Sequence, residues 1–356
     1  MEFQTQSLRK ASLSLVGRLN IGLRQVHSNN QARSVLRSIE GQQGPTNGKA
    51  IAHANQYAQE VLGSATYAPW LHVYTAIKGA FTEGWIPDNY YAFVVGPNKG
   101  GAAAGIAMVK SFTNRILMSD AIPDIAYSLA GVFYSRDFRP MRTNEITTVL
   151  FDGQDRVVFK ADGSCQGRGI WVLTRDDFEN GVPELPDGVF QSPIRQHEFF
   201  SGISPNSTAT LRMTTAKEPD GSVAIKAAYL RGGRAADRFV SCQTHVRVPL
   251  DKHTGEFSET GYMHDWRKID RHPDTGFRFA GNRIPHFENI VALCKSLHES
   301  CPHFLCIGWD TCINEDEQVE IMEWNAQYND IKFSEATTGP CFSGLGWEDL
   351  WKARMS

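Results

Sequence analysis

The chain has 356 residues, which is too long for a single small core, so we expect two or three subdomains. It is 41% hydrophobic and 21% charged with a formal net charge of −3, and this slight acidic excess argues against a general nucleic-acid-binding protein. No apolar run of about 18 residues predicts a membrane span, and the seven cysteines, which lack the spacing of a disulfide framework, favour a reducing cytoplasm.

The N-terminal part of the chain predicts mainly helix. Residues 1–50 are polar and helical and end in a loop, without the apolar stretch of about 7–15 residues that marks a signal peptide. Apolar residues three or four apart predict a helix from residue 52 to about residue 80. A short α/β segment follows, with a strand over Tyr90–Val95, a turn over Gly96–Gly101 and a helix over Ala102–Met118.

The rest of the chain predicts short strands with helices between them. The strands are expected at Ala126–Tyr134, Arg156–Lys160, Ile170–Leu173, Val189–Ile194, Ala209–Thr215, Ala224–Leu230 and Phe239–Val248. Helical patterns lie at Glu145–Phe151 and Phe287–His298. Strands paired in hairpins beside helices indicate an α+β fold rather than a doubly wound parallel sheet.

The segment IGWDTCINEDEQVEIMEWNAQ predicts an acidic hairpin. A turn centred on Asp316–Glu317 places Asp310 directly opposite Glu323, with their Cβ atoms roughly 5 Å apart, and Asn325 shares their face. Facing carboxylates repel each other, and a divalent cation such as Mg²⁺, which binds oxygen ligands, would offset that repulsion. The alternative is a solvent-facing strand pair with scattered acids.

The segment VVFKADGSCQGRGIWVL places Lys160 at the end of one apolar strand and a glycine-rich loop before the next. Gly163, Gly167 and Gly169 would let backbone N–H groups approach an anion closely, and Arg168 adds positive charge. The loop is not a Walker A motif, because the GxxxxGK[ST] spacing is absent and the loop joins two strands. From these residues alone, a phosphate-binding loop and a plain mobile loop both stay open.

The order of these features resembles the ATP-grasp superfamily. Lys110, which by itself reads as a solvated helix lysine, precedes Lys160 and its loop; a strand and Glu198 follow; and GWD…EWN closes the series. QHEFF, TATLRMTT, HPDTGFRFAGNRIPHFENI and IGWD are similar to the branch called sugar-transfer-associated ATP-grasp proteins. RAADRFVSCQTHVRV departs from the Asp-Asn pair followed by Gly-Gly that this branch leads us to expect.

The resemblance implies a fold in which two α+β subdomains grip ATP. We therefore expect a mainly helical region over residues 1–100 and an ATP-grasp domain over residues 101–356. Within that domain the lid subdomain would span about 135–195 and the metal-binding subdomain about 196–345.

The resemblance also implies a nucleotide site. Residues expected to contact the ATP phosphates are Lys110, Lys160, Gly163, Ser164, Gly167, Arg168 and Gly169. Residues expected at the adenine and ribose are Gln191, Ser192 and Ile194, through their backbone, and Glu198. Asp310, Glu323 and Asn325 would bind two Mg²⁺ ions, with Mn²⁺ as a substitute, and Glu323 would bridge them.

The chemistry implied by the resemblance is carboxylate activation. ATP would convert a small-molecule carboxylate into an acyl phosphate, an amine would displace phosphate to form an amide, and ADP would be released, in polysaccharide or natural-product biosynthesis. Arg212 would face the reacting groups together with Lys160 and Arg231. No covalent nucleophile is needed, so Cys165 in the loop is taken as incidental.

Two alternative functions and the position of the acceptor site stay open at this stage. The same fold could transfer phosphate to a stable acceptor, or bind nucleotide without turnover. The acceptor site is not identified: His264, Asp265 and His272 lie in a loop-rich stretch and would either line it or be solvated loop residues.

Overall fold

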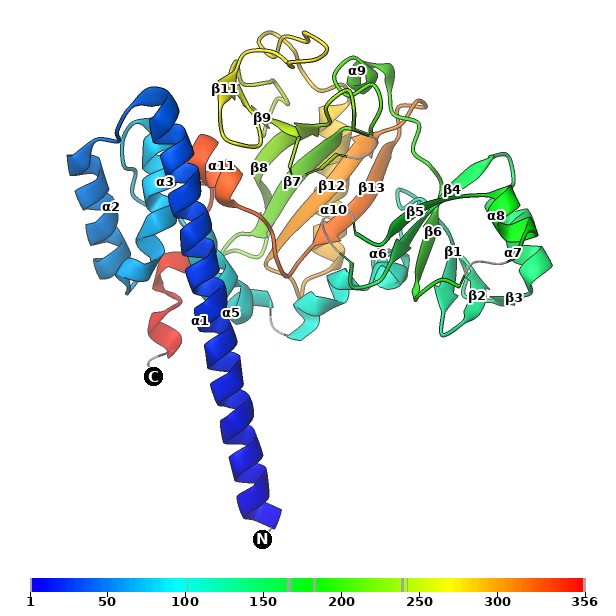
Figure 1. Cartoon of the computed structure of the whole chain (residues 1–356), viewed down its shortest axis with the longest axis horizontal. Coiled ribbons are helices and arrows are strands. Elements are labelled where there is room, and N and C mark those ends of the chain that lie inside the picture. Colours follow the sequence, from blue (N-terminus) through cyan, green and yellow to red (C-terminus); the bar gives the residue numbers. More distant parts are fainter. Residues whose placement is uncertain are drawn as a thin grey trace. The chain divides into compact units, whose positions relative to one another are not determined.

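The computed structural model describes residues 2–100, 102–164, 168–181, 184–237, 240–241 and 243–354 (Figure 1). The chain divides into two compact units. The first unit consists of Met1–Asn98, Asp265–Arg267 and Asp330–Ser356, and the second of Lys99–His264 and Lys268–Asn329. The fold is α+β with a helical N-terminal region, as predicted, whereas the proposed domain limits stay predictions.

Helices make up the first unit. Their bounds are α1 (Glu2–Gln43), α2 (Gly48–Glu60), α3 (Ala68–Lys78), α4 (Asp88–Tyr90), α5 (Gly96–Gly100) and α11 (Lys332–Thr337), with 3-10 turns at Ala65–Tyr67 and Trp347–Asp349. The helix α3 is buried along almost its whole length, and α1, α2 and α11 pack against it. Nothing in the described helices is both long and apolar enough to cross a membrane.

Three predictions in this region were wrong. The single helix expected from residue 52 to residue 80 is two helices, which separate where Gly63 adopts a φ of +79°. The strand expected over Tyr90–Val95 is helical, and so is much of the turn expected after it. The bulky residues there favour a strand locally, but Tyr90 and Tyr91 are each followed four residues later by Val94 and Val95, and all four are buried, which is the pattern of one helix face.

The segment that leads into the second unit is not the continuous helix that was predicted. Instead of one helix over Ala102–Met118 the chain forms 3-10 turns over Ala102–Met108 and Lys110–Phe112 and then the short helix α6 (Thr113–Leu117). Lys110 therefore starts a tight turn rather than standing on a helix face.

A six-stranded antiparallel sheet comes first in the second unit. Its strand order is β3-β2-β1-β6-β4-β5. The strands are β1 (Asp124–Leu129), β2 (Val132–Ser135), β3 (Pro140–Met141), β4 (Arg156–Ala161), β5 (Ile170–Thr174) and β6 (Gly188–Gln191), with helices α7 (Thr143–Leu150) and α8 (Arg175–Glu179). The strand predicted over Ala126–Tyr134 is a hairpin, because Ala130 and Gly131 turn the chain at positive φ.

A seven-stranded antiparallel sheet follows, in the order β11-β10-β9-β8-β7-β12-β13. The strands are β7 (Thr210–Lys217), β8 (Val223–Gly232), β9 (Val246–Leu250), β10 (Gly261–Tyr262), β11 (Lys268–Ile269), β12 (Cys306–Ile313) and β13 (Val319–Asn325), with helices α9 (Glu198–Ser201) and α10 (Phe287–Ser300). The strand predicted over Phe239–Val248 begins only at Val246; Phe239 lies outside the described residues.

The two faces of the seven-stranded sheet differ in chemistry. Helix α10 packs against β7, β8, β12 and β13, as Figure 1 also shows. Leu211, Met213 and Trp309 belong to the core with α10. Side chains alternate along a strand, so Arg212 and Asp310 lie on the other face. This second face carries the candidate site.

Candidate functional site

The hairpin of β12 and β13 has the predicted register at its polar centre. Asp310 pairs with Glu323, and Gly308 with Asn325, which confirms that the two carboxylates lie opposite each other. One residue further, the register shifts and Thr311 pairs with Ile321. Met322 is the extra residue of this β-bulge, and a bulge removes a residue from the regular ladder.

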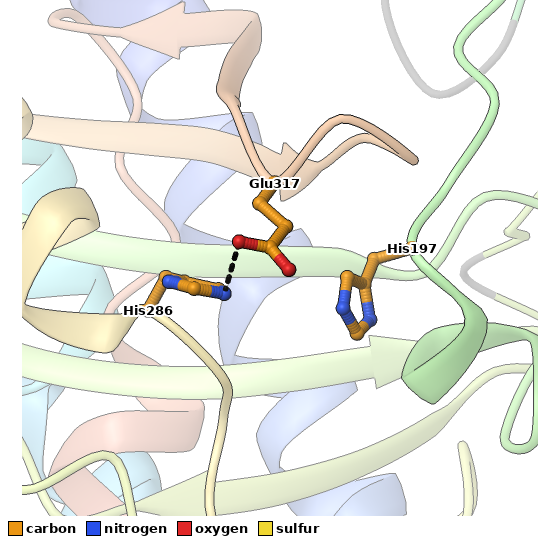
Figure 2. A group of neighbouring side chains, drawn as sticks. All are labelled: His197, His286 and Glu317. Carbon is orange, nitrogen blue, oxygen red and sulfur yellow. Dashed lines mark ion pairs between the residues drawn. The ribbon is translucent and has the colours of Figure 1, made fainter.

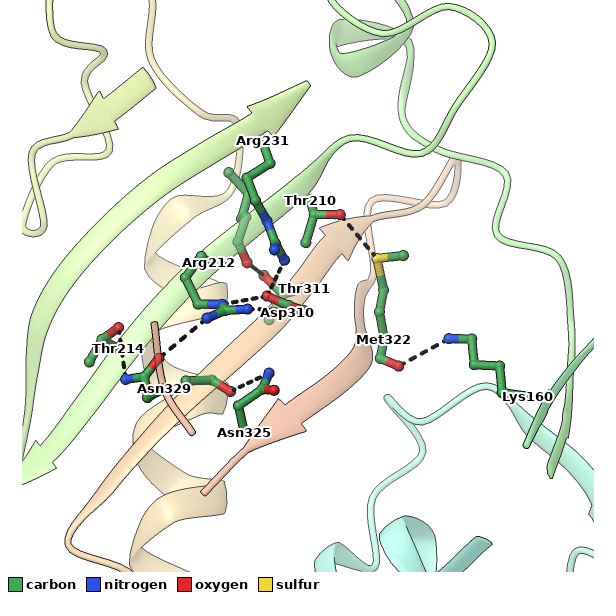
Figure 3. A network of polar contacts seen from close by, with 12 residues as sticks. Lys160, Thr210, Arg212, Thr214, Arg231, Asp310, Thr311, Met322, Asn325 and Asn329 are labelled. Carbon is green, nitrogen blue, oxygen red and sulfur yellow. Dashed lines mark hydrogen bonds and ion pairs between the residues drawn. The ribbon is translucent and has the colours of Figure 1, made fainter. Parts of the chain in front are cut away.

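The bulge provides a contact for Lys160. Lys160 lies on β4 of the six-stranded sheet, and its Nζ donates to the carbonyl oxygen of Met322 at 3.2 Å (Figure 3). The lysine therefore reaches from one sheet of the second unit to the hairpin of the other, next to Glu323.

Charges of both signs surround Lys160. Burial lowers the pKa of Lys160; the carboxylates of Glu323 and Asp124 act against that shift, and the second lysine, Lys110, adds to it. Two lysines and two carboxylates thus lie close together in a partly enclosed site. Two ammonium groups beside predicted metal ligands fit a polyanion such as a nucleotide phosphate tail with its metal.

The root of the glycine-rich loop is bonded to the segment before the first sheet. Lys110 Nζ donates to the carbonyl oxygen of Ser164 at 2.6 Å and to its Oγ at 3.2 Å. The backbone and hydroxyl of Ser111 both donate to Asp162, at 2.9 and 2.6 Å. These bonds place Lys110 beside Ser164, at the root of the loop that begins after Lys160.

The far end of the loop closes on its beginning. Ala161 N donates to Gly169 O at 2.8 Å, and Gly163 and Gly169 have φ of +65° and +68°, where glycine is favoured. Arg168 is exposed. Gly167 and Cys165 lie outside the described residues, so the predicted role of Gly167 stays a prediction.

Asp310 is held by two arginines from neighbouring strands. Arg212 donates to it from Nε at 2.6 Å and from Nη2 at 3.1 Å, and Arg231 Nη2 lies 2.5 Å from Oδ1 (Figure 3). Burial alone would raise the pKa of Asp310, but the two guanidinium groups outweigh it and lower the pKa to about 2. The arginines therefore provide part of the charge compensation that the sequence suggested a metal would supply.

The chemistry of the remaining donors suits Mg²⁺. Asp310, Glu323 and Asn325 share one face and offer carboxylate and amide oxygens, the hard ligands that Mg²⁺ binds. An ionised carboxylate has about four lone-pair positions, so three contacts from arginines still leave Asp310 able to accept another. The Nδ2 of Asn325 donates to Gly308 O at 3.4 Å, so the amide oxygen is the atom that could face a metal.

Sequence reasoning missed a buried acid beside the predicted adenine contacts. Asp124 accepts from Gln191 Nε2 at 2.8 Å and from the Tyr127 hydroxyl at 3.2 Å. Burial raises the pKa of Asp124 to about 6, against these hydrogen bonds and the charge of Lys160. Its position directly before an apolar strand was the only signal in the sequence.

The structure gives the positions of the residues predicted to bind adenine and ribose, but it does not test their contacts with a nucleotide. Ser192 N donates to Pro123 O at 3.0 Å, so this N–H group is already engaged. Ile194 is half-buried after β6, and Glu198 is exposed at the start of α9. Their roles stay predictions.

One of the candidate acceptor residues has a structural explanation. His272 is buried, its Nε2 lies 3.1 Å from Gly233 O, and its Nδ1 accepts from Asp274 N at 3.3 Å. Asp274 in turn binds Arg234 through both carboxylate oxygens, at 2.7 and 2.6 Å. The ring of His272 therefore braces this loop.

A comparison with protein families matches a segment that lies mostly in the second unit and extends into the first. The model of the family described as "sugar-transfer associated ATP-grasp" covers residues 181–344. This segment matches the sugar-transfer-associated ATP-grasp family. The match confirms the resemblance predicted from the sequence, and it contains Arg212, Arg231 and the three predicted metal ligands, whereas Lys110 and Lys160 precede it.

Solved structures with similar folds are distant in sequence. N5-carboxyaminoimidazole synthetase from Staphylococcus aureus is 10% identical with a TM-score of 0.40, over 67% of this chain and 52% of that one. Biotin carboxylase from Campylobacter jejuni, in a beta-gamma-ATP complex, is 9% identical with a TM-score of 0.46, over 90% of this chain and 68% of that one. The chain spans about half the length of the first of these relatives, and no curated protein matches its sequence significantly.

The ATP-grasp segment and the residues before it thus divide the site between them. The segment supplies the acidic hairpin and the arginines, on β12, β13, β7 and β8. The preceding sheet supplies Lys160 and the glycine-rich loop, and Lys110 is bonded to that loop.

Proposed function

We propose that this protein is an ATP- and Mg²⁺-dependent carboxylate–amine ligase that forms an amide through an acyl phosphate and releases ADP and phosphate. The observation that carries the proposal is the position of Lys160: it contacts the Met322 carbonyl beside Glu323, and Lys110 lies close enough to lower its pKa. Lysines beside a facing acid pair are an arrangement suited to a nucleotide phosphate tail with its metal.

Under this proposal each group of residues has a defined task. Lys110 and Lys160 neutralise phosphate charge, and the loop from Gly163 to Gly169 covers the phosphates. Asp310, Glu323 and Asn325 hold Mg²⁺, which when bound polarises the phosphate oxygens and offsets their charge. Glu198 and the backbone around Ile194 bind the nucleoside.

The reaction then needs positioning more than a covalent nucleophile. A substrate carboxylate oxygen attacks the γ-phosphorus in line, the bond to the bridging oxygen of ADP breaks, and an acyl phosphate results. An amine attacks the acyl carbon, phosphate leaves, and the amine loses a proton. Arg212 and Arg231 are held by Asp310 on the same face, where guanidinium groups can stabilise the oxyanion of the tetrahedral intermediate.

The substrate class and setting are part of the proposal. We place the acceptors among small molecules of polysaccharide or natural-product biosynthesis; the association of the family with sugar transfer supports the first of these settings. Cys294, Cys301 and Cys312 are buried thiols without a disulfide, which supports a reducing compartment such as the cytoplasm.

The test is a product assay with the full chain, ATP, Mg²⁺ and a panel of carboxylates and amines. We expect ADP and inorganic phosphate that depend on both an acid and an amine, together with the amide. Formation of AMP and pyrophosphate would overturn the acyl-phosphate route. Phosphate retained on the product without any amine would identify a phosphotransferase, and nucleotide binding without turnover would identify a non-catalytic module.

A further inference from the structure

Two histidines and a glutamate that the proposed ligase reaction does not use converge in the second unit. His197 comes from the segment between β6 and β7, His286 from the residue before α10, and Glu317 from the turn between β12 and β13. Each offers one ligand atom, and these atoms all lie within 4.8 Å of one another (Figure 2).

Backbone contacts fix His197 beside the hairpin turn. His197 N donates to Ile313 O at 2.9 Å, and Gln196 forms an isolated bridge with Asn314. Glu317 N donates to Asn314 O at 3.0 Å. The histidine and the glutamate therefore project from adjacent segments whose relative position is set by main-chain bonds rather than by flexible side chains.

Two of the three residues have left-handed backbone conformations. The φ of His286 is +50° and that of Glu317 is +61°, a region that side-chain-bearing residues seldom adopt. Glycine would fit both positions without strain. At both positions the chain instead carries a side chain with a potential metal-binding atom, directed toward the same point (Figure 2).

The donor set selects a class of ligand. Imidazole nitrogens suit Zn²⁺ and related transition metals, whereas Mg²⁺ and Ca²⁺ take oxygen ligands. Two histidines and one glutamate are a known zinc set that leaves one tetrahedral position for water. We propose that His197, His286 and Glu317 form a zinc site separate from the acidic hairpin face.

The distances allow this with small side-chain movements. His286 Nε2 and Glu317 Oε2 are 3.3 Å apart. Two ligands of one tetrahedral zinc with bonds of about 2.0–2.1 Å are about 3.3–3.4 Å apart. The third ligand atom must approach from within 4.8 Å, and the side chains of His286 and Glu317 are 33% and 60% exposed, so they have room to move.

One hydrogen bond opposes the site. His197 Nδ1 accepts from Phe199 N at 3.1 Å. Binding a metal through Nε2 moves the ring proton to Nδ1, so this bond is lost. The competing explanation is that His286 and Glu317 form an ion pair without a metal. In that case His197 has no role in the cluster.

Zinc binding would have a structural consequence for the second unit. His197 lies on the segment that leads from the last strand of the six-stranded sheet to the seven-stranded sheet. The metal would fasten this segment to the hairpin turn and to the start of α10. Glu198, the predicted ribose ligand, is the next residue, so its position would be fixed as well.

The test uses Zn²⁺ alone, without nucleotide, so its failure is distinct from failure of the ligase proposal. The full chain is stripped with a chelator and titrated with Zn²⁺ against a chromophoric competitor. We expect one tight equivalent in the wild type, at least tenfold weaker binding in His197→Ala, His286→Ala and Glu317→Gln, and no change in the exposed control His303→Ala.

A second readout covers variants that fold poorly. Glu317 is exposed on a turn, so Glu317→Gln should keep the fold, and the rise in melting temperature caused by Zn²⁺ in the wild type should shrink in it. The proposal is overturned if the wild type binds no Zn²⁺ at micromolar concentrations. It is equally overturned if Glu317→Gln or the His197→Ala/His286→Ala double variant keeps the wild-type equivalent, or if His303→Ala loses it to the same degree.

Discussion

Glu323 lies close to both the carboxylate of Asp310 and the ammonium group of Lys160. It faces Asp310 across the hairpin, and its carboxylate opposes the lowering of the pKa of Lys160. Because it is a predicted metal ligand and its charge also acts on Lys160, we expect Glu323→Gln to reduce Mg²⁺-dependent ADP formation by about 10²–10³, the loss typical of one electrostatic contact. Steady-state ADP release measures this.

A control on the same hairpin separates charge from fold. Glu315 is exposed in the turn and pairs with Arg195 at 3.2 Å, an exposed pair that contributes little to stability. Glu315→Gln should therefore keep both the activity and the circular dichroism spectrum of the wild type. Full activity in folded Glu323→Gln would contradict the metal assignment.

Substitution of Asp310 is expected to lower stability, because its partners are two arginines. The Asp310→Asn substitution leaves the buried Arg212 and the partly exposed Arg231 without their counter-charge. Removing one member of a buried ion pair costs about 3–5 kcal/mol of the free energy of unfolding. Urea denaturation at pH 7 should show a loss of this order.

Asp274 offers the matched comparison for Asp310. Asp274 also binds an arginine through both oxygens, but in a more accessible loop, where the side chains of Arg234 and Asp274 are 33% and 22% exposed. Asp274→Asn should cost less than Asp310→Asn. Equal losses would mean that burial does not set the strength of the Asp310 cluster.

At the scale of elements, the β12–β13 hairpin shows which structural features can be predicted from the sequence and which cannot. Alternation of apolar residues and a polar turn predicted the pairing of Asp310 with Glu323, because side chains on a strand repeat every two residues. The bulge at Met322 has no local signal, and it decides which carbonyl Lys160 contacts. Arg212 and Arg231 come from other strands, 98 and 79 residues before Asp310, so strand periodicity could not pair them with it.

The errors cluster where local preference and packing disagree. Tyr90–Val95 has strand-forming residues, but its burial follows helical spacing. Lys110 lies on a 3-10 turn, and its own Nζ donates to Ser164 at the root of the loop. The helical conformation of Tyr90–Val95, the turn at Lys110 and the buried position of Asp124 all depend on contacts with residues distant in the sequence. A short stretch of sequence does not show such contacts.

The loop root supports a prediction at this scale. A Cβ on Gly169 would lie 2.9 Å from Ser164 Cβ and 3.2 Å from Ala161 Cβ, whereas a Cβ on Gly163 would meet nothing within 4 Å. Both glycines have positive φ, so Gly163→Ala controls for backbone strain. We expect Gly169→Ala to raise the KM for ATP more than Gly163→Ala, because a displaced Ser164 moves Lys110.

The two variants also separate the loop from general stability. Both alanines should lower the melting temperature through their left-handed conformation. If the KM for ATP rises equally in both, or in neither, then the packing at the loop root does not position Lys110, and the loop would not act on the nucleotide through Ser164.

At the scale of the whole chain, the C-terminal segment returns to the N-terminal helices. Helix α11 packs against α3, and Glu335 on α11 is fully buried. Its carboxylate accepts from Ile86 N at 2.8 Å and from Cys341 N at 2.7 Å. One side chain therefore joins segments about 250 residues apart within the first unit.

Burial makes this junction dependent on pH. It raises the pKa of Glu335 to about 7, against the two backbone hydrogen bonds, from an ordinary value of 4.5. A raised pKa means that the folded state holds a proton that the unfolded state releases between these values, so stability falls as pH rises from about 4.5 to 7. A change of this size corresponds to roughly 3 kcal/mol.

Glu335→Gln tests this dependence directly. Glutamine cannot ionise, and the loss of one acceptor oxygen lowers its stability by an amount that does not change with pH. The free energy of unfolding of Glu335→Gln relative to the wild type should therefore increase by about 2–3 kcal/mol between pH 5 and pH 8. All other titrating groups are common to both proteins and cancel in this difference. Parallel stability curves from urea denaturation would show that Glu335 is ionised in the fold at pH 5 already, and that the junction between α11 and the N-terminal helices is a buried charge held by its two N–H donors.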